Sequence, residues 1–159
     1  MYYAESDKSP LILILENIDK SIRTYNDTSE RVSLSIAGCY ALTAIDTNGN
    51  ESTKLNKLCI DNCPYYTLPN VFSPGSDNFN DLFKPFPYRF VDKVDMVIYN
   101  RWGQEVFTTT NPDINWNGKD QVSGKDVSGG VYFYICDVFE RYLDGTRKRS
   151  MHGSITILR

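Results

Sequence analysis

Four cysteines carry the most distinct chemistry in this chain of 159 residues. Cys59 and Cys63 stand in a C-x3-C spacing, while Cys39 and Cys136 lie farther away in the sequence. A structural zinc site needs four ligands at suitable spacing, and His152 is the only histidine that could join the cysteines. We therefore predict disulfides, with reduced buried thiols as the first alternative and a metal site as the second.

The preferred pairing of the cysteines follows from a predicted hairpin. Asn48-Gly49 is a strong turn signal, because both residues accept a positive φ. Cys39 and Cys59 lie on the two strands that this turn would make neighbours. We expect a Cys39–Cys59 disulfide and a second disulfide, Cys63–Cys136, between a linker and a central strand.

Catalytic chemistry has little support in the sequence. The chain has one histidine, His152, and no G-x-S-x-G nucleophile motif. A Cys136–His152 couple is conceivable, but Cys136 lies among apolar strand residues, where structural thiols are found. We predict no catalytic residue, no cofactor and no enzyme, with His152 at the surface or at a strand end.

Two polar segments could supply oxygen ligands to a metal ion. Residues 46–51 place oxygen donors at alternate positions, as at the start of a calcium loop, but they lack the distal glutamate. The second segment holds four weak candidates: Asp77, Asn78, Asn80 and Asp81. Asn and Asp side chains also form turns through their own backbone, so we predict turns and no metal site in both segments.

Aromatic residues and the basic end of the chain are candidate binding groups. The aromatic residues that could line a sugar-binding face are Trp102, Phe107, Trp116, Tyr132 and Tyr134. At strand spacing such residues are usually core, which is our prediction. The basic residues near the carboxyl end are Arg147, Lys148, Arg149 and Arg159. They form either a solvated face or a docking patch.

Composition excludes two function classes. The formal net charge is −3, which gives no reason to expect a nucleic-acid partner. The chain has no apolar run of about 18 residues, so it has no segment that would cross a membrane as a helix. Apolar residues make up 41% and charged residues 23%, which is typical of a globular protein.

The elements that must position these residues are strands. Period-2 alternation or short apolar runs predict strands over 11–15, 32–36, 40–45, 56–60, 68–72, 94–100, 104–108, 131–139 and 153–158. Residues 140–149 are predicted to be a polar hairpin loop with Asp144-Gly145 at its tip. The strand over 131–139 is apolar on both faces, which is typical of a central strand covered on both sides. Dense strands without a long helix indicate an all-β sandwich.

The chain divides at about Cys63-Pro64. Residues 1–63 carry 6 basic and 9 acidic groups, whereas residues 64–159 carry 11 of each. The first residues, 1–7, have none of the three parts of a signal peptide, although the cysteines suggest export. Either the thiols are reduced and cytosolic, or the sequence is a piece of a longer protein.

An ordered set of motifs in the second part resembles a known family. The motifs are Leu68–Pro74, Asn80–Phe83, Ile98–Gly103, Val106-Phe107, Trp116–Lys119, Gly129–Tyr134 and Gly153–Arg159. Together they resemble the gliding-motility-associated C-terminal domain, the type B sorting domain of the type IX secretion system of the Bacteroidetes. The resemblance covers residues 67–159 and implies an Ig-like antiparallel β-sandwich.

The first part resembles the second half of a fibronectin type III domain. The segments that carry this resemblance are Gly38–Asp46 and Asn48–Ser52, which match a penultimate strand and the hairpin to the last strand. The remaining strands of such a domain would lie before Met1. The expected organisation is a partial fibronectin type III-like β-sandwich at 1–63 and a sorting domain at 64–159.

These resemblances imply a sorting signal that acts by protein–protein recognition. The expected partners are proteins of the type IX machinery in the periplasm and outer membrane, and the expected destination is the cell surface or the medium. The candidate recognition residues are Trp102, Gly103, Gly129, Gly130, Arg147, Lys148, Arg149 and Arg159. The alternative function is an adhesion or carbohydrate-binding module, and attachment to a cell-surface glycan or lipopolysaccharide is a further possibility.

Overall fold

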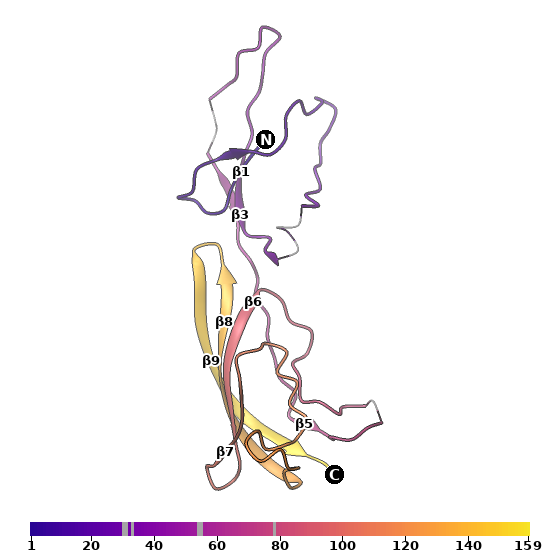
Figure 1. The fold of residues 1–159 in the computed structure, drawn as a ribbon. Helices are drawn as coiled ribbons and strands as arrows, with labels where there is room; N and C mark the ends of the chain where they lie inside the picture. The colour runs from indigo at the N-terminus through magenta and orange to yellow at the C-terminus, as the bar shows by residue number, and fades with distance from the viewer. Residues whose placement is uncertain (30–31, 33, 54–55, 78) are drawn as a thin grey trace. The chain divides into compact units, whose positions relative to one another are not determined.

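The computed structural model describes residues 1–29, 32, 34–53, 56–77 and 79–159, and the chain in it divides into two units (Figure 1). The first unit comprises Met1–Cys63 together with Tyr142–Gly145, and the second comprises Pro64–Arg141 and Thr146–Arg159. No helix in the described ranges is long and apolar enough to cross a membrane.

The first unit contains a small sheet with the strand order β2-β1-β3-β4. Its strands are β1 (Tyr2–Ala4), β2 (Ile12–Leu13), β3 (Gly38–Ala41) and β4 (Leu58–Ile60), and every pairing is antiparallel. The turn at Asn48-Gly49 joins β3 to β4, with Gly49 at a φ of 83°. The apolar residues buried here are mostly small: Tyr3, Ala4, Ala37, Cys39 and Ala41.

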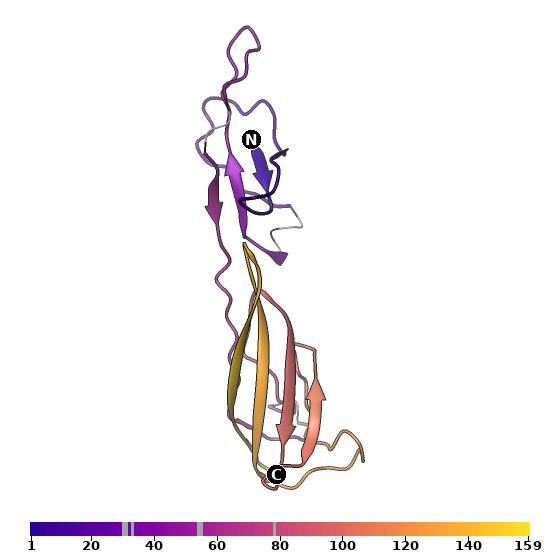
Figure 2. The ribbon, with the colours of Figure 1, turned by 90° about the vertical axis from the view of Figure 1, so that its left-hand side faces the viewer.

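The second unit is built on a five-stranded sheet with the order β5-β9-β8-β6-β7. Its strands are β5 (Val71–Phe72), β6 (Val91–Tyr99), β7 (Glu105–Thr109), β8 (Gly130–Tyr142) and β9 (Gly145–Ile157). Figure 2 shows β8 and β9 running side by side along this unit. β5 pairs with β9 in parallel, and β6 pairs antiparallel with both β7 and β8.

The core of the second unit lies on one face of this sheet. Alternate residues of β6, β8 and β9 point into it, because successive side chains of a strand face opposite sides. Segments outside the strands close the core from the other side, and among them Phe83 and Trp116 form an isolated antiparallel bridge. The buried cluster consists of Tyr66, Phe72, Phe83, Val94, Met96, Ile98, Val106, Ile114, Trp116, Tyr132, Tyr134, Cys136, Val138, Ile155 and Ile157.

The all-β class predicted from the sequence is confirmed, and most predicted strands overlap an observed one. The prediction over 32–36 is wrong, since none of its described residues lies in a strand. The predicted hairpin with Asp144-Gly145 at its tip is confirmed, but the loop over 140–149 is wrong in length, because β8 continues to Tyr142 and β9 begins at Gly145. The strand β1 was not predicted.

The prediction that both faces of the 131–139 strand are covered is wrong in one respect. β8 is central, with β9 and β6 on either side of it. Tyr132, Tyr134 and Cys136 are buried, but Val131, Phe133 and Ile135 are 43%, 50% and 55% exposed. The unit supplies a core to one face only, so the alternate apolar residues of β8 lie at the surface.

Candidate functional site

The turn between β6 and β7 presents Trp102 to solvent. The Asn100 side-chain oxygen accepts hydrogen bonds from the backbone N–H groups of Trp102 and Gln104, both at 3.0 Å. Gly103 adopts a φ of 79°, a conformation that favours glycine. The Trp102 side chain, held on this rigid turn, is 78% exposed, and the Arg101 guanidinium lies 5.4 Å from the centre of its ring.

The Gly129-Gly130 turn at the start of β8 lies beside the Trp102 turn. Gly130 has a φ of 137°, and a Cβ atom there would lie 2.8 Å from the Arg101 guanidinium. Gly129 is less constrained, since the nearest atom to its ideal Cβ is the Ile157 carbonyl oxygen at 3.5 Å. The structure therefore brings Trp102, Gly103 and Gly130 together around Arg101.

Arg159, two residues after β9, is held by the segment between β7 and β8. Its Nε donates to the Val127 carbonyl at 2.9 Å, and its Nη2 donates to the Gly118 carbonyl at 3.0 Å. Nη2 also lies 3.4 Å from Asp126 Oδ1. These bonds fix the last residue of the sorting-domain motif against the body of the unit.

The basic residues expected to form one terminal group are not one surface. Lys148 Nζ pairs with Asp137 at 2.9 Å, whereas Arg149 Nε donates to the buried Glu140 carboxylate at 2.7 Å. Adjacent residues of a strand face opposite sides, so Arg147 and Lys148 also point in different directions. Arg159 follows the end of β9, about ten residues after Arg149 and roughly 35 Å away at about 3.4 Å per residue of extended chain.

In the oxygen-rich segment the side chain of Asp77 stabilises a turn. Asp77 Oδ1 accepts the Phe79 backbone N–H at 2.9 Å, which is the Asx turn expected from the sequence. Asn80 has a φ of 55°, and Asp81 lines a hollow of about 370 Å³ together with Arg159. The candidate Asn78 lies outside the described residues.

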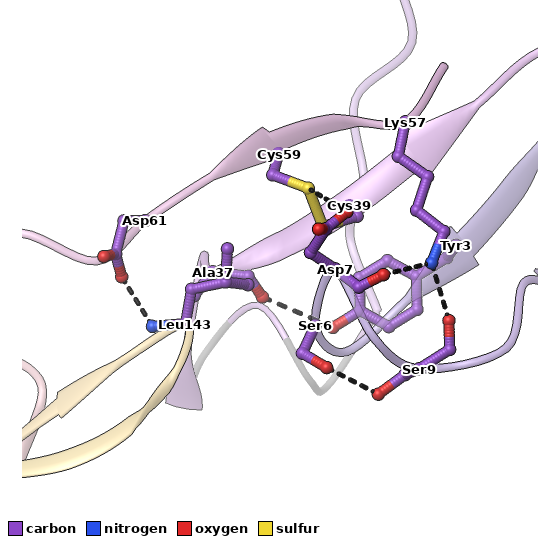
Figure 3. The surroundings of a disulfide bond; sticks show 10 residues. All are labelled: Tyr3, Ser6, Asp7, Ser9, Ala37, Cys39, Lys57, Cys59, Asp61 and Leu143. Atoms are coloured by element: carbon purple, nitrogen blue, oxygen red, sulfur yellow. Dashed lines mark hydrogen bonds between the residues drawn. A yellow bond between two sulfur atoms is a disulfide. The ribbon is translucent and has the colours of Figure 1, made fainter. Parts of the chain in front are cut away.

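The Cys39–Cys59 disulfide is present, and it joins directly opposed residues of β3 and β4 (Figure 3). Asp7 lies beside it, with Oδ1 4.0 Å from Cys59 Sγ. Asp7, Cys39 and Cys59, all in the described part of the chain, each place one potential metal-ligand atom within 4.8 Å of the other two. Both sulfurs are committed to the disulfide, so they are not thiolate ligands.

The second expected disulfide, Cys63–Cys136, is not formed. Cys63 and Cys136 are thiols, the first exposed and the second buried. Burial raises the pKa of the Cys136 thiol to about 12. Because thiol–disulfide exchange requires a thiolate, this protonated thiol does not take part in exchange at neutral pH. Cys136 is fully buried while His152 is exposed, so the two do not form a catalytic couple.

The aromatic residues divide between core and surface. Trp116 is fully buried, and its Nε1 donates to the Lys119 carbonyl at 2.8 Å. Tyr132 and Tyr134 are also buried, which agrees with the predicted core role. Phe107 is partly buried and packs against the core. The predicted core role is wrong for Trp102, which is 78% exposed because it lies on the turn between β6 and β7 and not in a strand.

Sequence reasoning missed one apolar surface on the side of β6 and β8 opposite the core, where the side chains of β8 are exposed and those of β6 are half-buried. These residues are Val97, Tyr99, Val131, Phe133 and Ile135. The signal was visible as apolar residues on both faces of the 131–139 segment, but this pattern predicts a covered strand and not an exposed one.

Comparison with protein families gives a match over most of the second unit. Residues 66–157 match the model of the CHU_C type IX secretion signal domain. The chain belongs to this family. No curated protein and no solved structure matches the chain. Type IX secretion signal domains are sorting domains, so this family assigns the second unit a role in export through the type IX system to the cell surface or the medium.

Proposed function

We propose that residues 64–159 are a folded export signal that the type IX apparatus recognises in the periplasm and carries through the outer membrane. The observation that carries this proposal is the family match over 66–157. The buried aromatic core of the second unit supports recognition of a folded surface, since an extended peptide would have no such core. Within this family we propose the gliding-motility-associated, type B class and a source among the Bacteroidetes.

The recognition surface that we propose includes the Trp102 turn. Trp102 is an exposed aromatic on a turn fixed by Asn100, and the neighbouring Gly130 allows Arg101 to pack closely. Tryptophan and arginine are enriched among residues that dominate binding energies. A rigid tryptophan loses little conformational entropy when a partner covers it.

For residues 1–63 we propose a fibronectin type III-like module that belongs to the exported part of the protein and not to the sorting domain. The antiparallel pairing of β3 and β4 across the Asn48-Gly49 turn supports this, because that hairpin is the part of the fold that the resemblance identifies. Asp46 stabilises the turn by accepting the backbone N–H groups of Asn48 and Asn50, at 2.9 and 2.8 Å.

An export assay tests the main proposal. The full chain is fused to the carboxyl end of a reporter that carries its own signal peptide, and the fusion is expressed in a bacterium with a type IX system. We expect the reporter in the medium or on the cell surface, and in the periplasm when the apparatus is deleted. Release that does not depend on the apparatus would contradict the proposal.

Recognition at the turn is tested by Trp102→Ala in the same fusion, with Phe79→Ala as the matched control. Both side chains are highly exposed, at 78% and 74%, so neither change removes core packing. We expect Trp102→Ala to lower export and Phe79→Ala to leave it unchanged. Equal export of the two variants would exclude the turn from the recognition surface.

A further inference from the structure

The outer face of the five-stranded sheet carries an apolar patch in the second unit. We use the name outer patch for its five residues: Val97, Tyr99, Val131, Phe133 and Ile135. Those on β8 are between 43% and 55% exposed, whereas the alternating residues of the same strand are at most 8% exposed. A contrast of this size along one strand shows that the exposure belongs to the face and not to a frayed end.

The register makes these side chains neighbours. Val97 lies opposite Ile135, and Tyr99 lies opposite Phe133, in the antiparallel pairing of β6 and β8. Directly opposed residues place their Cβ atoms about 4.5–5.5 Å apart, so each pair forms a continuous apolar surface. A hollow of about 410 Å³ opens over this surface, with Val97, Tyr99 and Ile135 among its lining residues and Thr108 at its side.

The sequence of β8 is that of a strand with a cover on each face. A strand with one face in water normally alternates apolar and polar residues, yet positions 131, 133 and 135 are apolar as well as 132, 134 and 136. The neighbouring strand β9 does not share this feature, since Lys148 and Ser150 both bond to Asp137. The apolar character is therefore confined to β6 and β8.

At the end of the outer patch nearest Asp95 and Asp137, the charged border is neutralised by its own ion pairs. Asp95 and Asp137 lie opposite each other, and each has a lysine partner: Lys93 Nζ lies 3.2 Å from Asp95, and Lys148 Nζ lies 2.9 Å from Asp137. Lys93 also lies over the Phe139 ring, 4.2 Å from its centre. A complementary partner therefore presents an uncharged apolar surface to the patch.

We infer that the outer patch is a docking surface for a protein of the type IX apparatus that covers it with an uncharged, apolar ridge. This inference rests on the proposed export function. An apolar centre bordered by ion pairs is the composition of a specific but separable interface. A stable interface uses roughly 20–30 residues on each side, and permanent dimers use more, so five apolar residues suit a transient partner better than a second copy of this chain.

The test replaces two outer-patch residues by threonine, which favours strands, in the full-chain export fusion. Phe133→Thr with Ile135→Thr is compared with the control pair Phe79→Thr and Val122→Thr, whose side chains are 74% and 97% exposed and lie outside the sheet. We expect export of the patch variant to fall about tenfold, which corresponds to about 1.4 kcal/mol of binding free energy lost by the two truncations together, and the control to match the parent.

The outcomes separate the inference from the function on which it rests. A parent fusion that is not exported overturns both. An exported parent with an equally exported patch variant overturns the docking surface alone. A parent chain that is a dimer by light scattering, and a monomer when the patch is changed, assigns the patch to a second copy and also overturns the inference.

A crosslinking measurement covers the case in which the patch variant does not fold. A photoreactive phenylalanine analogue replaces Phe133 in one fusion and Phe79 in the control. We expect crosslinks to a component of the apparatus from position 133 and none from position 79. Export without any crosslink from position 133 would overturn the inference.

Discussion

The two units reach a folded state in different ways. Among its described residues, the second unit packs fifteen buried side chains into one cluster, with aromatic rings in contact around Trp116. The first unit has strands of two to four residues and a buried set that is mostly alanine, and it contains the disulfide. Burial of large apolar side chains stabilises the second unit, whereas a covalent link compensates for a small core in the first.

This difference has a functional meaning. A sorting domain has to keep a defined surface for a partner, and a large core fixes the turns and faces that form this surface. Substitutions in the core of the second unit should therefore cost more stability than any change in the first, and changes at exposed sites should cost least.

The largest effect is expected for Trp116→Ala. The indole packs against the rings of Phe72, Phe107 and Tyr132 at centroid distances of 5.4–5.9 Å. Removing it leaves a cavity, which costs about 3–5 kcal/mol in buried aromatic-to-alanine changes. Urea unfolding of the second unit measures this loss, and Trp102→Ala is the matched control, expected to change stability by less than about 0.5 kcal/mol. Equal losses for the two tryptophans would contradict the core assignment.

Loss of the disulfide should have the next largest effect, and only in the first unit. Cys39 and Cys59 are separated by 20 residues in the sequence. Closing a loop of that length contributes about 3 kcal/mol in the chain-entropy description. We expect the double variant Cys39→Ala with Cys59→Ala to lower the unfolding midpoint of the first unit. Hydrogen exchange of the backbone amides of β3 and β4 measures this loss. Cys63→Ala is the control, and equal destabilisation by this change would contradict the assignment.

The strands and the first disulfide could be predicted because they have local signals. Alternation and β-branched residues located the centres of β6 and β8, and the Asn48-Gly49 turn made Cys39 and Cys59 neighbours. The length of β9 could not be predicted in the same way. Its first residues are charged on both faces, and their partners, such as Glu140 for Arg149, come from another strand.

The candidate site was predictable where it depends on turns. Trp102 and Gly130 lie at turns, as predicted. A glycine in the sequence indicates where the backbone can adopt a positive φ, and Gly103 and Gly130 both do so. The basic residues near the carboxyl end do not form one surface, because neighbouring residues in a strand face opposite sides and pair with different acidic residues. The outer patch could not be predicted from the sequence. Apolar residues on both faces of a strand indicate that each face is covered, but they do not indicate whether the same chain supplies the cover.

A smaller effect is expected at the turn beside Trp102, where two adjacent glycines allow a matched comparison. Gly130 has a φ of 137° and faces Arg101, whereas Gly129 has ordinary space around its ideal Cβ. We expect Gly130→Ala to cost about 1–2 kcal/mol through backbone strain, and Gly129→Ala to cost about 0.5 kcal/mol or less. Chemical denaturation of both variants tests this, and equal stability of the two would contradict the conformational requirement at 130.

The smallest effect is expected from single carboxylates at the surface, one in each unit. In the second unit the Ser150 hydroxyl, at 2.5 Å, and then Lys148 lower the pKa of Asp137 below its ordinary value. In the first unit hydrogen bonds from Asn50 lower the pKa of Asp46. A lowered folded-state pKa adds stability above the unfolded-state value of about 3.9, and this stability is lost as the pH falls through the folded-state value.

Ser150→Ala separates the two carboxylates, because it removes the main cause of the shift at Asp137 and leaves the turn around Asp46 untouched. We expect NMR titration of the side-chain carboxyl carbons to show the pKa of Asp137 rising toward its ordinary value in the variant, with Asp46 unchanged. Acid unfolding of the second unit should then begin at a higher pH, since the variant lacks the stability that the lowered pKa of Asp137 contributes above the unfolded-state value. An unchanged Asp137 titration would show that Lys148 and not the hydroxyl controls this carboxylate.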